Sequence, residues 1–194
     1  TLFRSDLLDR SFRGKDPARV YDEVLGRAPV APDESLLHQC IRDRIVMVSG
    51  AAGSIGSELC RQILVNRPRQ LLLVDMNEYG LYRMEQELRQ TARRENMGDI
   101  DIMPMLGNVL DLRRMLQIMK TFGVETIYHA AAYKHVPMVE ANVVEGVRNN
   151  VLGTWSLVRA ASEAAVETFV LISTDKAVRP ASVMGASKRC AELI

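Results

Sequence analysis

The sequence has 194 residues, which is enough for one well-buried domain with a small appendage and too short for two full-sized domains. Hydrophobic residues make up 47% and charged residues 25%, and the net charge of +1 gives no basic excess for holding a phosphate backbone. No apolar run reaches the roughly 18 residues that a membrane span needs, and the N-terminus lacks a signal-peptide core. We therefore expect a soluble chain that does not bind nucleic acid.

Residues 1–44 are charged and interrupted by glycine and proline, which predicts an N-terminal appendage. Asp16-Pro17 can start one short helix there. Asp33 can cap a second helix that continues to Ile41.

From residue 45 onward, short apolar runs alternate with stretches of helical period. This alternation predicts an α/β fold, a doubly wound parallel sheet of Rossmann type, over residues 45–194. Apolar stripes such as Leu81, Met84 and Leu88, or Val151, Trp155 and Val158, predict the buried helix faces. The predicted strands are Ile45–Ser49, Leu71–Asp75, Asp101–Leu106, Thr126–Ala130 and Thr168–Ser173.

The first predicted strand leads directly into a glycine-rich turn and then a helix. Gly50, Gly53 and Gly56 have the spacing of a variant dinucleotide-binding turn, in which a helix N-terminus faces a pyrophosphate. Asp75 ends the second strand at the distance expected for a carboxylate that binds the adenosine ribose. We therefore predict a nicotinamide dinucleotide and favour NAD over NADP, because Asp75 would repel a 2′-phosphate. A turn that uses glycine only for its geometry is the alternative.

The three cysteines are far apart and form no CxxC pair, which favours a reducing compartment and hence the cytoplasm. Three histidines without a suitable spacing or a cysteine partner do not predict a metal site. The sequence lacks an initial methionine and stops within a helical pattern, so we expect it to be part of a longer protein. Flanking parts could carry a membrane anchor in the inner membrane or a substrate lobe, and the present chain alone could be inactive.

Four segments are more specific than the glycine turn: residues 129–137 (HAAAYKHVP), 140–150 (EANVVEGVRNN), 173–176 (STDK) and 184–188 (MGASK). Together they resemble the UDP-N-acetylglucosamine 4,6-dehydratases of bacterial polysaccharide biosynthesis, which are extended short-chain dehydrogenases. The resemblance runs from about Val30 to the end of the chain. It implies oxidation at the sugar C4, loss of water across C5 and C6, and return of the hydride to C6, with a UDP-sugar substrate and a homo-oligomeric assembly.

The resemblance also implies roles for individual residues. Asp175 would protonate the leaving C6 hydroxyl and Lys176 would remove the C5 proton, and both need a pKa shifted toward neutrality. Thr174 would donate to the C4 oxygen. A polar turn that only follows a strand is the alternative for these three residues.

Lys188 matches the lysine of the YxxxK signature of short-chain dehydrogenases, where it binds the nicotinamide ribose. Met184 stands where the tyrosine of that signature would be, and a thioether cannot accept a proton from the C4 hydroxyl. Some members of the resembled family also carry methionine there. The base for C4 therefore stays open between Lys188, Lys176 and a water held by Thr174, of which we favour the water.

The remaining candidates lie around the same strand ends. Lys134 and Asn150 are predicted to serve the nucleotide sugar, with a solvated lysine and a structural asparagine as alternatives. Asn108 is predicted to read the adenine or to serve only as a turn residue. The predicted cofactor contacts are Gly50, Gly53, Ser54, Ile55, Gly56, Asp75, Asn108, Val109, Ala130, Ala131, Ala132 and Lys188.

Two other functions compete with the dehydratase. A nucleotide-sugar epimerase would use the same cofactor domain, but it needs no acid for a C6 hydroxyl, so Asp175 and Lys176 favour dehydration. A non-catalytic dinucleotide-binding module is the second alternative, and Met184 is the best argument for it.

Overall fold

The computed structural model describes residues 34–98 and 100–194. Residues 35–194 form one compact unit. The helix predicted after Asp16 lies outside the described residues. Helix α3 (Glu34–Cys40) confirms the second predicted helix, and Ile41 behind it is buried in the core of the sheet domain. The domain boundary at residue 44 stays a prediction.

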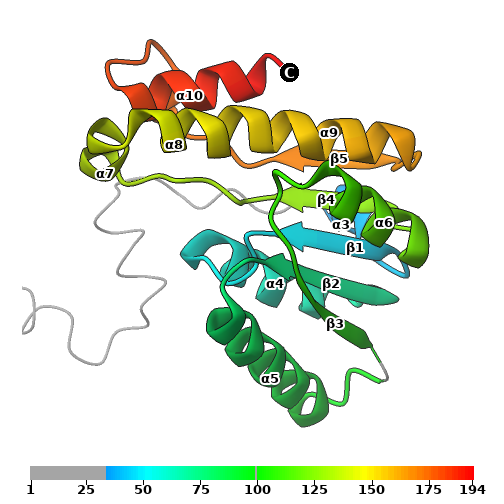
Figure 1. Cartoon of the computed structure of the whole chain (residues 1–194). Helices are drawn as coiled ribbons and strands as arrows, with labels where there is room; N and C mark the ends of the chain where they lie inside the picture. The colour runs from blue at the N-terminus through cyan, green and yellow to red at the C-terminus, as the bar shows by residue number, and fades with distance from the viewer. Residues whose placement is uncertain (1–33, 99) are drawn as a thin grey trace, which may run out of the picture. The chain divides into compact units, whose positions relative to one another are not determined.

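Five parallel strands form one sheet in the order β3-β2-β1-β4-β5 (Figure 1). This order confirms the predicted doubly wound Rossmann-type sheet. Strands β2 and β3 are added on one side of β1, and β4 and β5 are added on the other side, so the strand order reverses between β1 and β4. The register is continuous, with Met47 of β1 paired to Leu72 of β2 on one side and Ile127 of β4 on the other. The strands are β1 (Ile45–Ser49), β2 (Gln70–Asp75), β3 (Asp101–Leu106), β4 (Thr126–His129) and β5 (Thr168–Leu171).

Alternate residues of the central strands face opposite layers of helices. Val46 and Val48 pack in one hydrophobic cluster with α4 (Ser54–Val65) and α5 (Glu78–Arg94). Met47 packs in the other cluster with α6 (Leu112–Phe122) and α9 (Gly153–Glu163). Both faces of β1 are therefore covered, as expected for a parallel sheet.

The connection from β4 to β5 contains several helical segments before α9. It runs through α7 (Val136–Ala141), α8 (Val143–Val147) and a single π-helical turn (Arg148–Leu152). A π-helical turn inside a helix is uncommon and often marks a functional site. After β5, a 3-10 turn (Asp175–Ala177) leads to the last helix, α10 (Val183–Glu192).

Three sequence predictions need correction. The last two strands end earlier than predicted, β4 at His129 and β5 at Leu171, and the backbone bonds from Ala130 to Ser49 and from Ile172 to His129 lie just beyond these ends.

The predicted helix faces are partly confirmed. The stripe Leu81, Met84 and Leu88 is buried as predicted. The prediction of a buried stripe centred on Trp155 is wrong, because this residue is 44% exposed and its ring lies under the guanidinium of Arg159. The buried face of α9 consists of small residues and Leu157.

Within residues 34–98 and 100–194, no helix is both long enough and apolar enough to cross a lipid bilayer. In the same described part of the chain, no group of three or more His, Cys, Asp or Glu side chains is arranged to hold a metal ion.

Candidate functional site

The glycine turn between β1 and α4 is tightly packed against the end of β4. Gly50 has a φ of 74°, in the left-handed region that favours glycine. A Cβ at Gly50 would lie 2.6 Å from the backbone nitrogen of Ala131, and a Cβ at Gly56 would lie 1.9 Å from the carbonyl oxygen of Gly50. Internal packing therefore requires both glycines.

Gly53 differs from these two glycines. Its φ of −76° suits any residue, and a Cβ there would meet only one atom within 4 Å, the carbonyl oxygen of Gly50 at 3.2 Å. Packing alone thus gives a weak reason for glycine at this position. Because Gly53 directly precedes α4, a missing side chain leaves the helix N-terminus open to a bound anion.

Asp75 connects the end of β2 to the glycine turn. Its Oδ2 accepts a hydrogen bond from the backbone nitrogen of Ala52 at 2.9 Å, and its Oδ1 accepts one from that of Asn77, also at 2.9 Å. An ionised carboxylate has about four lone-pair sites, so each oxygen can accept a further bond. The side chain is fixed in orientation and still available to a ligand hydroxyl.

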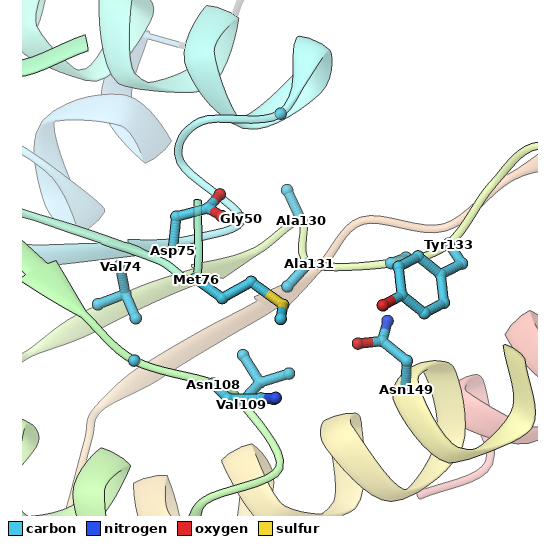
Figure 2. A pocket seen from close by; sticks show the side chains of 13 residues that line it. Gly50, Val74, Asp75, Met76, Asn108, Val109, Ala130, Ala131, Tyr133 and Asn149 are labelled. Carbon is cyan, nitrogen blue, oxygen red and sulfur yellow. The ribbon is translucent and has the colours of Figure 1, made fainter. Parts of the chain in front are cut away.

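A pocket of about 170 Å³ lies along the carboxyl ends of β1, β2 and β4 (Figure 2). Figure 2 shows Asp75 beside the glycine turn at one side and Val109 with Asn108 at the other. Eight of the predicted cofactor residues line it: Gly50, Gly53, Asp75, Asn108, Val109, Ala130, Ala131 and Ala132. Of the remaining predicted contacts, Ile55 is exposed, Gly56 lies under the turn, and Ser54 and Lys188 lie elsewhere.

Sequence reasoning missed five residues that line this pocket: Val74, Met76, Gly107, Tyr133 and Asn149. Most of them adjoin a predicted residue, so their signal was proximity to the strand ends. Tyr133 and Asn149 lie at the same side of the pocket (Figure 2). The position of Asn149 at the pocket depends on the π-helical turn, which the sequence pattern did not predict.

Asn108 is both a turn residue and a lining residue of the pocket. Its Oδ1 accepts a hydrogen bond from the backbone nitrogen of Leu110 at 2.9 Å, which makes it a turn residue. It also lines the pocket. The reading of an adenine by Asn108 stays a prediction.

Lys134 lies at the N-terminus of α4. Its Nζ donates a hydrogen bond to Ser54 Oγ at 2.5 Å. Both residues line a second and larger cavity of about 570 Å³, which extends past His135 and Met138 along α7 and α8. A cation beside a helix N-terminus increases the positive potential there.

Asn150 is buried, with 1% of its surface exposed, and its amide is committed to the protein. Its Oδ1 accepts from the Tyr133 nitrogen at 2.8 Å, and its Nδ2 donates to the Tyr133 carbonyl at 2.9 Å and to Ser187 Oγ at 3.0 Å. Burial and these hydrogen bonds favour the structural alternative, in which Asn150 holds the loop after β4. Contact of Asn150 with the substrate stays a prediction.

The predicted catalytic residues lie at the carboxyl end of β5 and on α10, and none of them lines the pocket in Figure 2. Asp175 is largely exposed. Its Oδ1 accepts from Thr174 Oγ1 at 2.9 Å and from Lys176 Nζ at 3.3 Å. These two partners hold the pKa of Asp175 below its ordinary value. In this structure the neighbours therefore shift the pKa of Asp175 away from neutrality, opposite to the direction that an acid role needs.

Lys188 and Met184 are both buried on α10. The Nζ of Lys188 donates to the Ile172 carbonyl at 2.7 Å, just beyond β5, and burial lowers its pKa. Met184 is 2% exposed. Its thioether cannot take up a proton as the tyrosine hydroxyl of the signature would. Gly185 lets α10 approach closely, since a Cβ there would lie 2.3 Å from the Lys176 carbonyl oxygen.

The strand order, the glycine turn and the pocket at the strand ends define a Rossmann-type domain of the extended short-chain dehydrogenase class. Residues 46–194 match the family described as "Polysaccharide biosynthesis protein". The chain belongs to this family.

Several curated relatives are similar to the chain. The capsular polysaccharide biosynthesis protein CapD of Staphylococcus aureus is 42% identical over 173 residues, covering 89% of this chain and 28% of the relative. A UDP-glucose 4-epimerase of Rickettsia bellii is 31% identical over 77% of the chain, which spans 42% of that protein. A UDP-N-acetylglucosamine 4,6-dehydratase (inverting) of Campylobacter jejuni is 29% identical over 74% of the chain, which spans 40% of that enzyme. The chain thus spans less than half the length of these relatives.

Solved structures show the same fold. Pen from Bacillus thuringiensis superposes with a TM-score of 0.70 at 27% identity, over 79% of this chain and 46% of that one. DesIV from Streptomyces venezuelae, a dTDP-glucose 4,6-dehydratase with NAD and TYD bound, superposes with a TM-score of 0.64 at 25% identity, over 76% of this chain and 49% of that one.

Proposed function

We propose that this chain is the NAD-binding domain of a nucleotide-sugar 4,6-dehydratase that acts on UDP-N-acetylglucosamine. The observation that carries the proposal is the placement of two groups at one edge of the sheet. The glycine turn and Asp75 follow β1 and β2, and the Asp175-Lys176 pair follows β5. Ligands of open parallel sheets bind along this edge, beside the point where strand order reverses.

The residues of the pocket fit a dinucleotide. A side chain at Gly53 would stand in front of the N-terminus of α4, where a pyrophosphate could accept from backbone N–H groups. The two oxygens of Asp75 can each accept one ribose hydroxyl in addition to their backbone donors. Val109 supplies an apolar wall on the adenine side.

The charge of the pocket supports NAD over NADP. Asp75 would repel a 2′-phosphate at the ribose it faces. The lining residues of this pocket, all within the described part of the chain, include no lysine or arginine that could neutralise such a phosphate. When bound, NAD supplies a reversible hydride acceptor for the sugar C4.

Asp175 and Lys176 support dehydration because this reaction needs both an acid and a base near C5 and C6. In the present structure Asp175 is exposed and ionised, and its partner Lys176 is 54% exposed. A sugar lying on this turn would remove water from both groups. Desolvation raises the pKa of a carboxyl group and lowers that of an ammonium, which is the direction that acid and base roles need.

The base for the C4 hydroxyl has three candidates: Lys188, Lys176 and a water held by Thr174. Met184 cannot accept a proton, and Lys188 is already hydrogen bonded to the Ile172 carbonyl. Thr174 lies at the surface beside Asp175, where its hydroxyl can hold a water molecule. We therefore favour a water relay at Thr174. Installing a phenol with Met184→Tyr tests this: unchanged turnover supports the relay, and a rise of about 100-fold, the usual scale of one general base, would contradict it.

Epimerisation of a nucleotide sugar is the second candidate, because a UDP-glucose 4-epimerase is among the relatives. The products of the two reactions differ in mass by one water. Mass spectrometry of UDP-N-acetylglucosamine after incubation with the full-length protein and NAD should show loss of one water. A product of unchanged mass that chromatography separates from the substrate would identify an epimerase, and the absence of any reaction together with intact NAD binding would favour a non-catalytic module.

A further inference from the structure

A buried histidine joins the ends of the two central strands. His129, the last residue of β4, is 1% exposed and shares a 2.7 Å hydrogen bond between its Nδ1 and the Oγ of Ser49, the last residue of β1. Its Nε2 lies 3.0 Å from the Oγ1 of Thr154 on α9. Both ring nitrogens are therefore used, and both partners are buried as well.

The direction of these hydrogen bonds follows from the Thr154 hydroxyl. Thr154 Oγ1 donates its hydrogen to the carbonyl oxygen of Asn150 at 2.7 Å. Because a hydroxyl has one hydrogen, Thr154 must accept from His129, so Nε2 carries a proton. In a neutral ring, Nδ1 then accepts from Ser49 Oγ. The neutral form compatible with these bonds is the Nε2–H tautomer.

The chain of hydrogen bonds continues from Asn150 to α10. Asn150 Nδ2 donates to Ser187 Oγ at 3.0 Å, and Ser187 Oγ donates to the Met184 carbonyl oxygen at 2.7 Å. The same Asn150 amide holds both backbone groups of Tyr133, which lines the pocket. One network therefore connects the base of the glycine turn, the loop after β4, and the helix that carries Met184 and Lys188.

The surroundings keep the ring uncharged. Burial, with a smaller contribution from the positive charge of Lys188, lowers the pKa of His129 to about 3. A neutral ring with its proton on Nε2 leaves Nδ1 as the acceptor for Ser49.

We propose that His129 is a positioning residue, whose neutral Nε2–H tautomer ties the pocket-lining strand ends to the orientation of α10 through Thr154 and Asn150. The functional part of this inference rests on the proposed cofactor pocket. The network itself does not, because its tautomer and its effect on α10 can be measured without a ligand. His129 does not line the proposed cofactor pocket, so its effect there passes through its hydrogen-bond partners.

The first experiment measures the tautomer by long-range ¹H–¹⁵N NMR of the histidine rings in the whole chain at neutral pH, without added ligand. We expect His129 as Nε2–H, and we expect Thr154→Val to convert it to Nδ1–H, because the ring then loses its acceptor and can only donate to Ser49. Thr154→Ser keeps the hydroxyl and should retain Nε2–H. A charged ring or an Nδ1–H ring in the unsubstituted protein overturns the proposal.

The second experiment tests whether the network reaches α10. In hydrogen exchange, Thr154→Val should speed exchange of the amides of α10 and residues 130–135 about tenfold, as expected for a lost buried hydrogen bond, and Thr154→Ser should not. Equal exchange in both variants overturns the coupling. If the unsubstituted protein binds no NAD, the proposed function fails, and these exchange and tautomer results still decide the present inference. If NAD binds, its affinity should fall with Thr154→Val and recover with Thr154→Ser.

Discussion

Two turns at the same edge of the sheet are built in different ways. The glycine turn after β1 is fixed by backbone contacts, with Gly50 against Ala131 and Gly56 against the Gly50 carbonyl. The turn after β5 is held mainly by exposed side chains, in which Asp175 accepts from Thr174 and Lys176. The first turn is therefore fixed by the fold, whereas the second depends on side chains that solvent can reach.

This contrast separates binding from chemistry. A pyrophosphate is recognised by backbone N–H groups and a helix N-terminus, which folding alone can position. An acid and a base need shifted pKa values, and these require removal of water. Under the proposed function, exposed Asp175 and Lys176 therefore need a substrate over them, whereas the glycine turn and Asp75 do not.

The largest expected effect concerns the chemical turn. Asp175→Asn should lower dehydration by about 100- to 10,000-fold, the usual contribution of one general acid. NAD affinity and stability should change little, because Asp175 is exposed and its ion pair with Lys176 lies at the surface. Assaying water loss, NAD binding and thermal unfolding together measures all three. Retained dehydration would remove Asp175 from the acid role.

The glycine turn should respond in stability. Gly56→Ala places a methyl group on the backbone of Gly50 and should cost about 3 kcal/mol, the upper range for overpacking. Gly53→Ala is the matched control, since its Cβ meets only one oxygen at 3.2 Å. We expect Gly53→Ala to weaken NAD binding more than stability, as measured by urea unfolding and calorimetry. Equal destabilisation by both changes would show that packing explains Gly53.

Asp75 should show its effect on affinity. Replacing Asp75 by Asn removes the charge that the ribose hydroxyls would face, and hydrogen bonds to charged groups are worth about 1.5–3 kcal/mol. NAD affinity should fall about 10- to 100-fold, and discrimination against NADP should shrink. Asp101→Asn, at the start of β3, is the control. An unchanged ratio of NAD to NADP affinity would dissociate Asp75 from the ribose.

The smallest effect is a pH dependence of stability from His129. Its pKa in the folded protein is lowered to about 3, below the ordinary value of 6.5, so the unfolded chain binds a proton first as pH falls. The stabilisation is present above pH 6.5 and decreases by at most about 1.4 kcal/mol per pH unit as pH falls toward 3. Urea unfolding at pH 7 and pH 5, compared with His129→Gln, isolates this slope. A slope equal in both proteins would contradict a buried neutral ring.

The sequence predicted the parts of the fold that depend on local pattern. All five strands were placed, because apolar runs such as Leu71–Val74 are buried on both faces of a parallel sheet. The end of β4 was placed too late, since the length of a strand depends on its pairing with the neighbouring strands. The face of α9 was misjudged because its buried residues are mostly small, while Trp155 packs with Arg159 at the surface.

The candidate site shows the same division. Gly50, Gly53 and Asp75 were found by spacing, because their roles follow from backbone geometry. The state of Asp175 was not predictable, since a pKa depends on exposure and on which side chains reach it. The network of His129 and Asn150 requires three-dimensional contacts between residues far apart in the chain, which no spacing reveals.

Calorimetric titration with NAD tests the central claim most directly, with the unsubstituted chain compared to Gly53→Ala and Asp75→Asn. We predict one NAD per chain, with weaker binding to both variants and to NADP. Absence of binding by the unsubstituted chain, or equal binding by all three proteins, would contradict the assignment of this pocket to a dinucleotide.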